Sequence, residues 1–308
     1  MKAPSSRNLA ASVSQRLLEH SRRQGEDHQY LLMRYGLERW MYRLGQSAYA
    51  DLFVVKGAMM FLVWSGSPYR PTKDLDLLAV ESCSIERLAD IFREVCRVKV
   101  VDDALDFLPA TVTAQAIREN AAYQGVRVTL EARLGKIEIP LQVDIGFGDA
   151  ITPKPQVGDF PVLLDFPPPR LALYARETAI AEKFEAMVHL DMANSRMKDF
   201  YDIWVLSQMF EFKAATLEAA IRATFKRRRT ELPLTAPVAL TEAFAGESAK
   251  IRQWQAFVKR GRFKLLAPEW AVVIRAARNF LVPLIETAPA GQKRPDHWPK
   301  GGPWRAAK

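Results

Sequence analysis

Two aspartates separated by a single residue, Asp74 and Asp76, are the clearest chemical signal in the sequence. They open an apolar run over 74–80 whose length and composition are typical of a buried strand. Side chains two residues apart leave the same face of a strand, roughly 7 Å apart at the Cα atoms. Carboxylates this close repel each other unless a cation offsets them. Mg²⁺ is the natural cation, because it prefers oxygen ligands and usually binds substrate phosphates as well.

A third carboxylate, Asp144, lies inside another apolar segment that reads as a strand, 137–145. An unpaired carboxylate in such a strand is costly, so Asp144 needs a partner. If the two strands are neighbours, Asp144 completes a three-carboxylate metal site with Asp74 and Asp76. In the alternative interpretation it only caps the turn that leads to Gly146.

Residues suited to binding phosphate precede the aspartate pair. Lys56-Gly57 ends a short β-type run and is followed by an apolar segment with helical spacing. A turn before a helix N-terminus presents backbone N–H groups to an anion, and Lys56 adds a point charge. Arg70 and Thr72 could either steady a substrate phosphate or pair with Asp74.

A second group of charged residues lies on two predicted helices of the C-terminal half. Lys183 aligns with the apolar stripe of the first helix, and Arg196 precedes the second. Asp199 and Asp202 lie on the first turns of that second helix, which is apolar on most sides, so both are expected to be buried. The acids could simply complement the helix dipole and pair with a lysine one turn away. Alternatively, the group forms the other wall of an active-site cleft.

The elements that must position these residues form an α/β core with helices before and after it. Strands are predicted at 52–55, 74–80, 111–117, 126–134 and 137–145, and C-terminal helices at 176–191, 195–210, 213–227, 239–260 and 269–286. The predicted organisation is N-terminal helices over 1–50, the α/β core over 51–165, a helical region that completes the cleft over 166–288, and a flexible basic tail over 289–308.

Composition restricts the class of protein. The 308 residues include only two cysteines, Cys83 and Cys96, which argues against a disulfide framework or a zinc site. The sequence shows no signal-peptide pattern and no apolar run of membrane-spanning length, so a cytoplasmic protein without a membrane partner is expected. An acidic middle lies between basic flanks, which either suit a polyanionic partner or only confer solubility. The basic run 226–229 could likewise be a solvated face or a nucleic-acid contact.

The order of these pieces resembles the nucleotidyltransferase AbiEii/AbiGii toxin family over roughly residues 30–210. The matching parts are Lys56-Gly57-Ala58, Arg70-x-Thr72-x-Asp74-x-Asp76, Asp144, Lys183 and Arg196-x-Lys198-Asp199-x-x-Asp202. The resemblance implies a minimal nucleotidyltransferase fold with a small mixed sheet, an NTP substrate and Mg²⁺ or Mn²⁺. It also implies the toxin role in a toxin–antitoxin or phage-defence (abortive infection) pair, with a cognate antitoxin as partner. Some members of the family add nucleotides to tRNA acceptor ends.

We therefore expect metal-dependent transfer of a nucleotide from an NTP to an acceptor, the tRNA 3′ end, which would inhibit translation and growth. Asp74 and Asp76 hold the metal, and Asp144 completes a second metal site or helps to deprotonate the attacking hydroxyl. The triphosphate is neutralised by residues of both groups: Lys56, the Gly57 backbone, Arg70, Thr72, Lys183 and Arg196. Asp199 or Asp202 orients these cations or contacts the nucleotide. The alternatives are a metal-dependent nuclease and a non-catalytic RNA- or protein-binding module.

Overall fold

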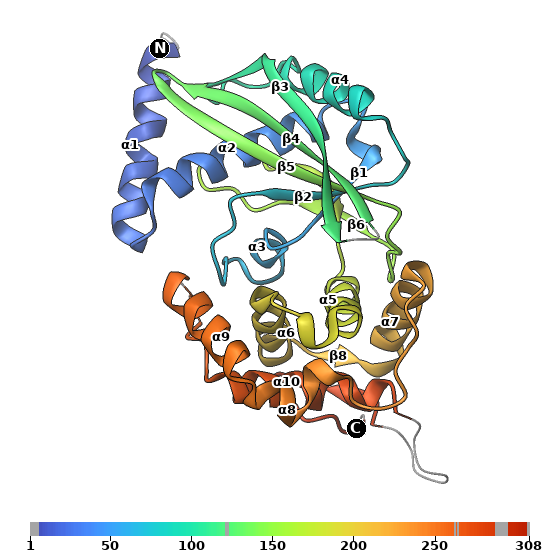
Figure 1. Cartoon of the computed structure of the whole chain (residues 1–308). Coiled ribbons are helices and arrows are strands. Elements are labelled where there is room, and N and C mark those ends of the chain that lie inside the picture. The colour runs from blue at the N-terminus through green and yellow to red at the C-terminus, as the bar shows by residue number, and fades with distance from the viewer. Residues whose placement is uncertain (1–5, 121–122, 262, 264, 287–294, 307–308) are drawn as a thin grey trace. The chain divides into compact units, whose positions relative to one another are not determined.

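The computed structural model describes residues 6–120, 123–261, 263, 265–286 and 295–306 (Figure 1). The chain forms two compact units, each built from more than one segment. The first comprises Met1–Pro68, Thr72–Gly148 and Gln156–Leu173, and the second comprises Tyr69–Pro71, Asp149–Pro155 and Tyr174–Lys308. The candidate residues Lys56, Gly57, Asp74, Asp76 and Asp144 therefore belong to the first unit. The second contains Arg70, Lys183, Arg196, Asp199 and Asp202.

A seven-stranded mixed sheet, in the order β3-β4-β5-β2-β1-β7-β6, is the framework of the first unit (Figure 1). The strands are β1 (Phe53–Lys56), β2 (Leu75–Ala79), β3 (Leu105–Asn120), β4 (Tyr123–Leu134), β5 (Ile137–Phe147), β6 (Gln156–Asp159) and β7 (Arg170–Leu173). β2 pairs with β5 and β1 pairs with β7 in parallel, whereas the other neighbours are antiparallel. The two central strands that carry Asp76 and Asp144 are therefore direct neighbours.

One face of this sheet forms the apolar core. Every second residue of β5 is an aliphatic side chain with almost no exposed surface: Ile139, Leu141, Val143 and Ile145. Helices α1 (Ser6–Gln24), α2 (His28–Gly45), α3 (Met60–Ser65) and α4 (Ile85–Cys96) belong to the same unit. Helix α2 packs on β5 and β7, and α4 packs on β3 and α2, where Trp40 stacks on Phe92. Because side chains alternate along a strand, the polar residues between the aliphatic ones lie on the opposite face.

The second unit is a helical assembly. Its helices are α5 (Arg176–Leu190), α6 (Met197–Met209), α7 (Ala214–Arg228), α8 (Glu242–Gly246), α9 (Ser248–Arg260) and α10 (Trp270–Leu281). Helix α5 packs on α6 and α7, and α6 packs on α9 and α10. A short antiparallel ribbon pairs β8 (Phe212–Lys213), which lies between α6 and α7, with β9 (His297–Trp298) near the C-terminus. None of the helices in the described ranges combines the length and apolar character needed to cross a membrane.

The mixed α/β class expected from the sequence is confirmed, with three local corrections. The sheet gains two short strands, β6 and β7, around the proline-rich segment that we had interpreted only as a crossover. The helix expected over 239–260 is divided, because Glu247 takes an extended conformation and its carboxylate caps α9 by accepting from the Ala249 N–H. The part of the tail over 295–306 is packed rather than flexible, whereas 287–294, 307 and 308 lie outside the described residues.

Two tryptophans explain why this part of the tail packs. The Trp298 side chain is buried and its indole N–H donates to the Ser207 carbonyl at 2.8 Å. The indole N–H of Trp304 donates to the Phe280 carbonyl at 2.8 Å. Burying Trp298 and packing Trp304 against it and Phe280, with both indole N–H groups hydrogen-bonded, outweighs the local preference of the Pro- and Gly-rich sequence for disorder.

Candidate active site

Four charged side chains form one row across the polar face of the sheet. Lys56 of β1 pairs in register with Asp76 of β2, Asp76 with Asp144 of β5, and Asp144 with Arg127 of β4. Directly opposed residues of neighbouring strands point to the same face, about 5 Å apart. The row thus alternates as cation, two carboxylates and cation. Asp74, two residues before Asp76, adds a third carboxylate beside it.

Glycine at position 57 is required by the position of Asp76. The Gly57 backbone has φ +74°, in the left-handed region, and a Cβ built there would overlap the Asp76 carboxylate. The carboxylate therefore rests directly on the Lys56-Gly57 turn. On the other side, the Lys56 ammonium lies 3.9 Å from the position of a Cβ at Gly146, so Lys56 leans toward β5. The absence of a side chain at Gly57 makes room for the Asp76 carboxylate, whereas a Cβ at Gly146 would only be in van der Waals contact with Lys56.

Asp74 is held at the start of β2 by local contacts. Its Oδ1 accepts from the Lys73 backbone N–H at 3.1 Å and from the Thr72 hydroxyl at 3.3 Å. The sequence left open whether Thr72 binds a substrate phosphate or pairs with Asp74, and the structure contains the Thr72–Asp74 contact. Arg70 pairs elsewhere, with Asp202 of its own unit.

Asp144 does not cap a turn. It lies inside β5, and both of its oxygens accept from Arg127, from Nε and from Nη2 at 2.8 Å each. This hydrogen-bonded pairing raises the pKa of the Arg127 guanidinium. Sequence reasoning overlooked Arg127, although a signal was available. The two-residue turn at Gly135-Lys136 fixes the hairpin register, and counting back from it sets Arg127 opposite Asp144.

The carboxylates fit a divalent cation only in part. Asp74 and Asp76 supply the hard oxygen donors that Mg²⁺ prefers, and the Asp76 carboxylate is positioned against the Gly57 backbone. However, no group of three or more His, Cys, Asp or Glu side chains in the described part of the chain is arranged to hold a metal ion. Asp144 lies beside Asp76 in the register, but its charge is already matched by Arg127.

In the helical unit, three cationic side chains form a network around two buried carboxylates. Lys183 of α5 bridges Asp199 at 2.9 Å and Asp202 at 2.8 Å. Arg70 binds both oxygens of Asp202, at 2.8 and 2.9 Å, and Arg196 contacts Asp199 at 2.6 Å. Each aspartate side chain is 1% exposed. We name Arg70, Lys183, Arg196, Asp199 and Asp202 the helical cluster.

The charges of this cluster stabilise one another. Burial alone would raise the pKa of Asp202, but Arg70 and Lys183 outweigh it and keep the pKa below its usual value. Burial is likewise outweighed at Asp199, whose pKa is lowered by Lys183 and Arg196. At Lys183 burial opposes the charged form, yet the two aspartates raise its pKa. The two acids and the lysine between them are therefore ionised at neutral pH.

One residue of the basic run at the end of α7, Arg228, belongs to a separate ion-pair cluster, whereas Lys226, Arg227 and Arg229 are exposed. The Arg228 side chain is buried and contacts Asp149 at 2.9 Å, Glu185 at 2.8 Å and Glu182 at 3.8 Å. Arg228 is thus neither part of a solvated face nor placed to contact a nucleic acid, the two possibilities left open by the sequence. It ties α7 to α5 instead.

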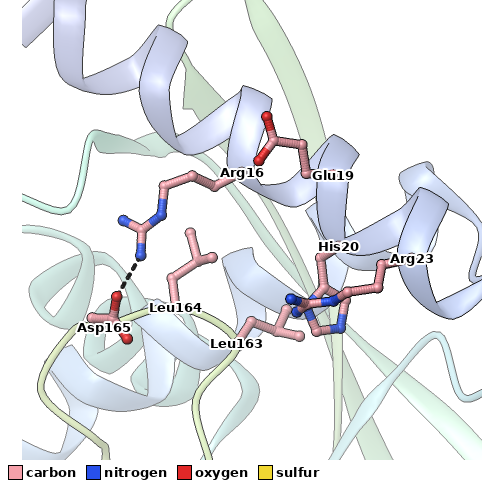
Figure 2. Close-up of a pocket in the computed structure, with 7 residues that line it drawn as sticks. All are labelled: Arg16, Glu19, His20, Arg23, Leu163, Leu164 and Asp165. Carbon is pink, nitrogen blue, oxygen red and sulfur yellow. Dashed lines mark hydrogen bonds and ion pairs between the residues drawn. The ribbon is translucent and has the colours of Figure 1, made fainter.

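A pocket of about 520 Å³ also lies in the first unit (Figure 2). It is lined by α1 and by residues 163–165, and Arg16 reaches across it to Asp165 at 2.8 Å. The other charged lining residues are Glu19, His20 and Arg23. None of the site residues predicted from the sequence lines this pocket.

Two solved structures from Helicobacter pylori are similar to this chain at low sequence identity. A "putative nucleotidyltransferase from H. pylori" shares 13% sequence identity with a TM-score of 0.49, covering 82% of this chain and 92% of the other. JHP933 from Helicobacter pylori gives the same identity and TM-score, covering 82% of this chain and 89% of that one. No curated protein matches the sequence.

The family comparison covers most of the chain. The model of the nucleotidyl transferase AbiEii toxin of type IV toxin–antitoxin systems matches residues 39–276. This range includes every candidate residue of the charged row and of the helical cluster. The family resemblance noted from the motifs is confirmed, and the chain belongs to the AbiEii family of nucleotidyl transferase toxins.

Proposed function

We propose that this chain transfers a nucleoside monophosphate from an NTP to a hydroxyl acceptor, with a divalent cation bound by Asp74 and Asp76. The observation that supports this most directly is the Asp76 carboxylate resting on Gly57, in a turn whose preceding residue is Lys56. Carboxylates for a cation and a cation-bearing turn for phosphate then lie on neighbouring strands, β1 and β2. When bound, Mg²⁺ would offset the negative charge of the triphosphate.

The reaction itself is an in-line displacement at the α-phosphorus. The acceptor oxygen forms a bond to that phosphorus, the bond to the oxygen bridging to the β-phosphate breaks, and pyrophosphate leaves with the bonding electron pair. The acceptor hydroxyl loses its proton to Asp144 or, where Asp144 instead completes a second metal site, to solvent. Lys56 and the Gly57 N–H bind the triphosphate and keep it in line, so that positioning and electrostatics supply most of the catalysis.

The helical cluster is proposed to bind phosphate as well. Its three cations exceed its two carboxylates, and the carboxylates are the buried members while Arg196 remains 35% exposed. The positive charge of the cluster is thus most accessible at Arg196, which suits an anionic ligand. Asp199 and Asp202 orient Lys183 and Arg196. A direct phosphate contact is not proposed for Arg70, because its Nε and Nη2 already donate to the two oxygens of Asp202.

For the acceptor we propose RNA, and specifically the tRNA 3′ end. The basic flanks of the sequence suit a polyanion, and a toxin that blocks aminoacylation would stop translation and growth. The type IV toxin–antitoxin family supports an antitoxin as the biological partner, a role in phage defence and action in the cytoplasm.

Incubation with labelled NTP, tRNA and Mg²⁺ tests this function. We expect NTP-dependent lengthening and labelling of the RNA, and a decrease of at least about 100-fold in D76N. The matched control is D106N, which neutralises an exposed aspartate on β3 of the same sheet. RNA shortened without NTP would identify a nuclease, and full labelling by D76N would exclude the proposed metal site.

A further inference from the structure

Arg127 is the end of the charged row, and its contacts go beyond an ordinary surface ion pair. Both of its hydrogen bonds to Asp144 are 2.8 Å long, the bidentate geometry that arginine forms with a carboxylate. The Gln142 amide, oriented with its oxygen toward Arg127, accepts from the same two nitrogens at 3.2 Å. Gln142 lies two residues before Asp144 on the same face of β5, so two side chains of one strand accept hydrogen bonds from the guanidinium.

The guanidinium also interacts with the rest of the carboxylates. Asp144, Asp74 and Asp76 all raise the pKa of Arg127. In the charged row Arg127 lies next to Asp144, to which it is hydrogen-bonded, and Asp76 is one strand further along. Its side chain is 34% exposed, whereas that of Asp144 is 9% exposed. The carboxylate is fixed in the sheet, and the arginine is the partner that can move.

We infer that Arg127 is a positioning residue that competes with a divalent cation for Asp144, an inference that rests on the proposed function. While the pair is closed, Asp144 is held beside Asp76 but its charge is matched, so the cation is bound by Asp74 and Asp76 without it. When Arg127 moves away, Asp144 becomes a ligand. An arriving triphosphate offers Arg127 a second bidentate partner, because phosphate oxygens match the same guanidinium fork.

This competition can be measured without turnover. Mn²⁺ binding to the full chain in the absence of nucleotide is followed by the loss of the free-ion EPR signal, in a double-mutant cycle of R127M and D144N. We expect D144N to weaken Mn²⁺ binding by less than about threefold while Arg127 is present, and by about tenfold or more in the R127M background. R127M alone should tighten binding, because it removes a positive charge and frees a ligand.

Equal effects of D144N in the two backgrounds would overturn the inference, whether both are small or both are large. R133M is the matched control: Arg133 is an exposed arginine on the same face of β4, and its removal should change Mn²⁺ affinity less than about twofold. R127K keeps the positive charge but loses the two-pronged guanidinium geometry. In the R127K background, D144N should therefore weaken Mn²⁺ binding by a factor between those in the wild-type and R127M backgrounds. If R127M does not fold by circular dichroism, the R127K cycle decides the question by the same criterion.

The same titration separates this inference from the proposed function. D76N should abolish tight Mn²⁺ binding in every background. Mn²⁺ binding that is unchanged in D76N contradicts the proposed metal site. Loss of binding in D76N together with additive effects of R127M and D144N contradicts only the role of Arg127.

Discussion

Replacing Lys183 by methionine tests whether the helical cluster holds its unit together. The ammonium bridges Asp199 and Asp202, and both aspartates are buried. The substitution K183M keeps most of the side-chain length but removes one cation from two carboxylates. Removing one partner of a buried ion pair costs about 3–5 kcal/mol. We expect the lower end, about 3 kcal/mol, because Arg196 and Arg70 each still neutralise one of the acids.

This magnitude is large enough to measure directly. In a unit of this size, about 3 kcal/mol lowers the Tm by roughly 6–12 °C. The assay is thermal and urea unfolding of the purified chain at neutral pH, followed by circular dichroism of its helices. The matched control is K198M, at an exposed lysine on the first turn of α6, which should change stability by less than about 0.5 kcal/mol.

The result also separates structure from catalysis at Lys183. If K183M is destabilised as expected, a loss of activity must be measured well below the new Tm before it is assigned to phosphate binding. A K183M protein as stable as K198M would refute the reasoning, because the two buried carboxylates would then not depend on the ammonium.

Three further outcomes follow from the same structure. G57A should lower activity at least about 100-fold and the free energy of unfolding by about 1–3 kcal/mol, because a Cβ would overlap the Asp76 carboxylate and the backbone has positive φ. Unfolding and activity curves of G57A that match those of the wild type would contradict this expectation. R228M should lower the free energy of unfolding by about 3 kcal/mol, measured in urea, because it removes the cation that the buried Glu185 shares with the partly buried Asp149 and Glu182; a loss below about 1 kcal/mol would argue against that role. The pKa values of Asp199 and Asp202 are lowered in the folded chain, so both acids stabilise it above the ordinary carboxyl pKa of about 3.9, and this stability is lost as the pH falls through their folded-state pKa values. The free energy of unfolding of D202N, measured in urea, should therefore depend less steeply on acid pH than that of the wild type. Parallel pH slopes for the two proteins would contradict this expectation.

Much of the frame could be predicted from local pattern. The alternation in 137–145 and the run after Asp76 gave strands β5 and β2, because the side-chain period of a strand is visible in the sequence. The helix containing Asp199 was expected to be apolar on most sides, and its acids are indeed buried. Lys183 was expected to point inward from its place on the apolar stripe, and its side chain is 18% exposed.

Pairings between distant segments could not be predicted in this way. Arg70 and Asp202 are 132 residues apart, and no local pattern indicates which acid an arginine will meet. The lysine one turn before Asp202, which one of the two interpretations made its partner, is exposed, and the acid pairs with Arg70 and Lys183 instead. Charges in an interior must be matched by whichever groups the packing brings near, and that is a property of the whole unit.

The sequence by itself determined the residue types, the carboxylate spacing of Asp74 and Asp76, and the Lys56-Gly57 turn at the end of a strand. These depend on backbone geometry over a few residues, which composition and spacing express directly. Only the tertiary structure decided that Asp144 is matched by Arg127, and that the cations of the helical cluster surround its acids. Such assignments depend on strand register and on burial, where the free energy of an unmatched charge selects the partner.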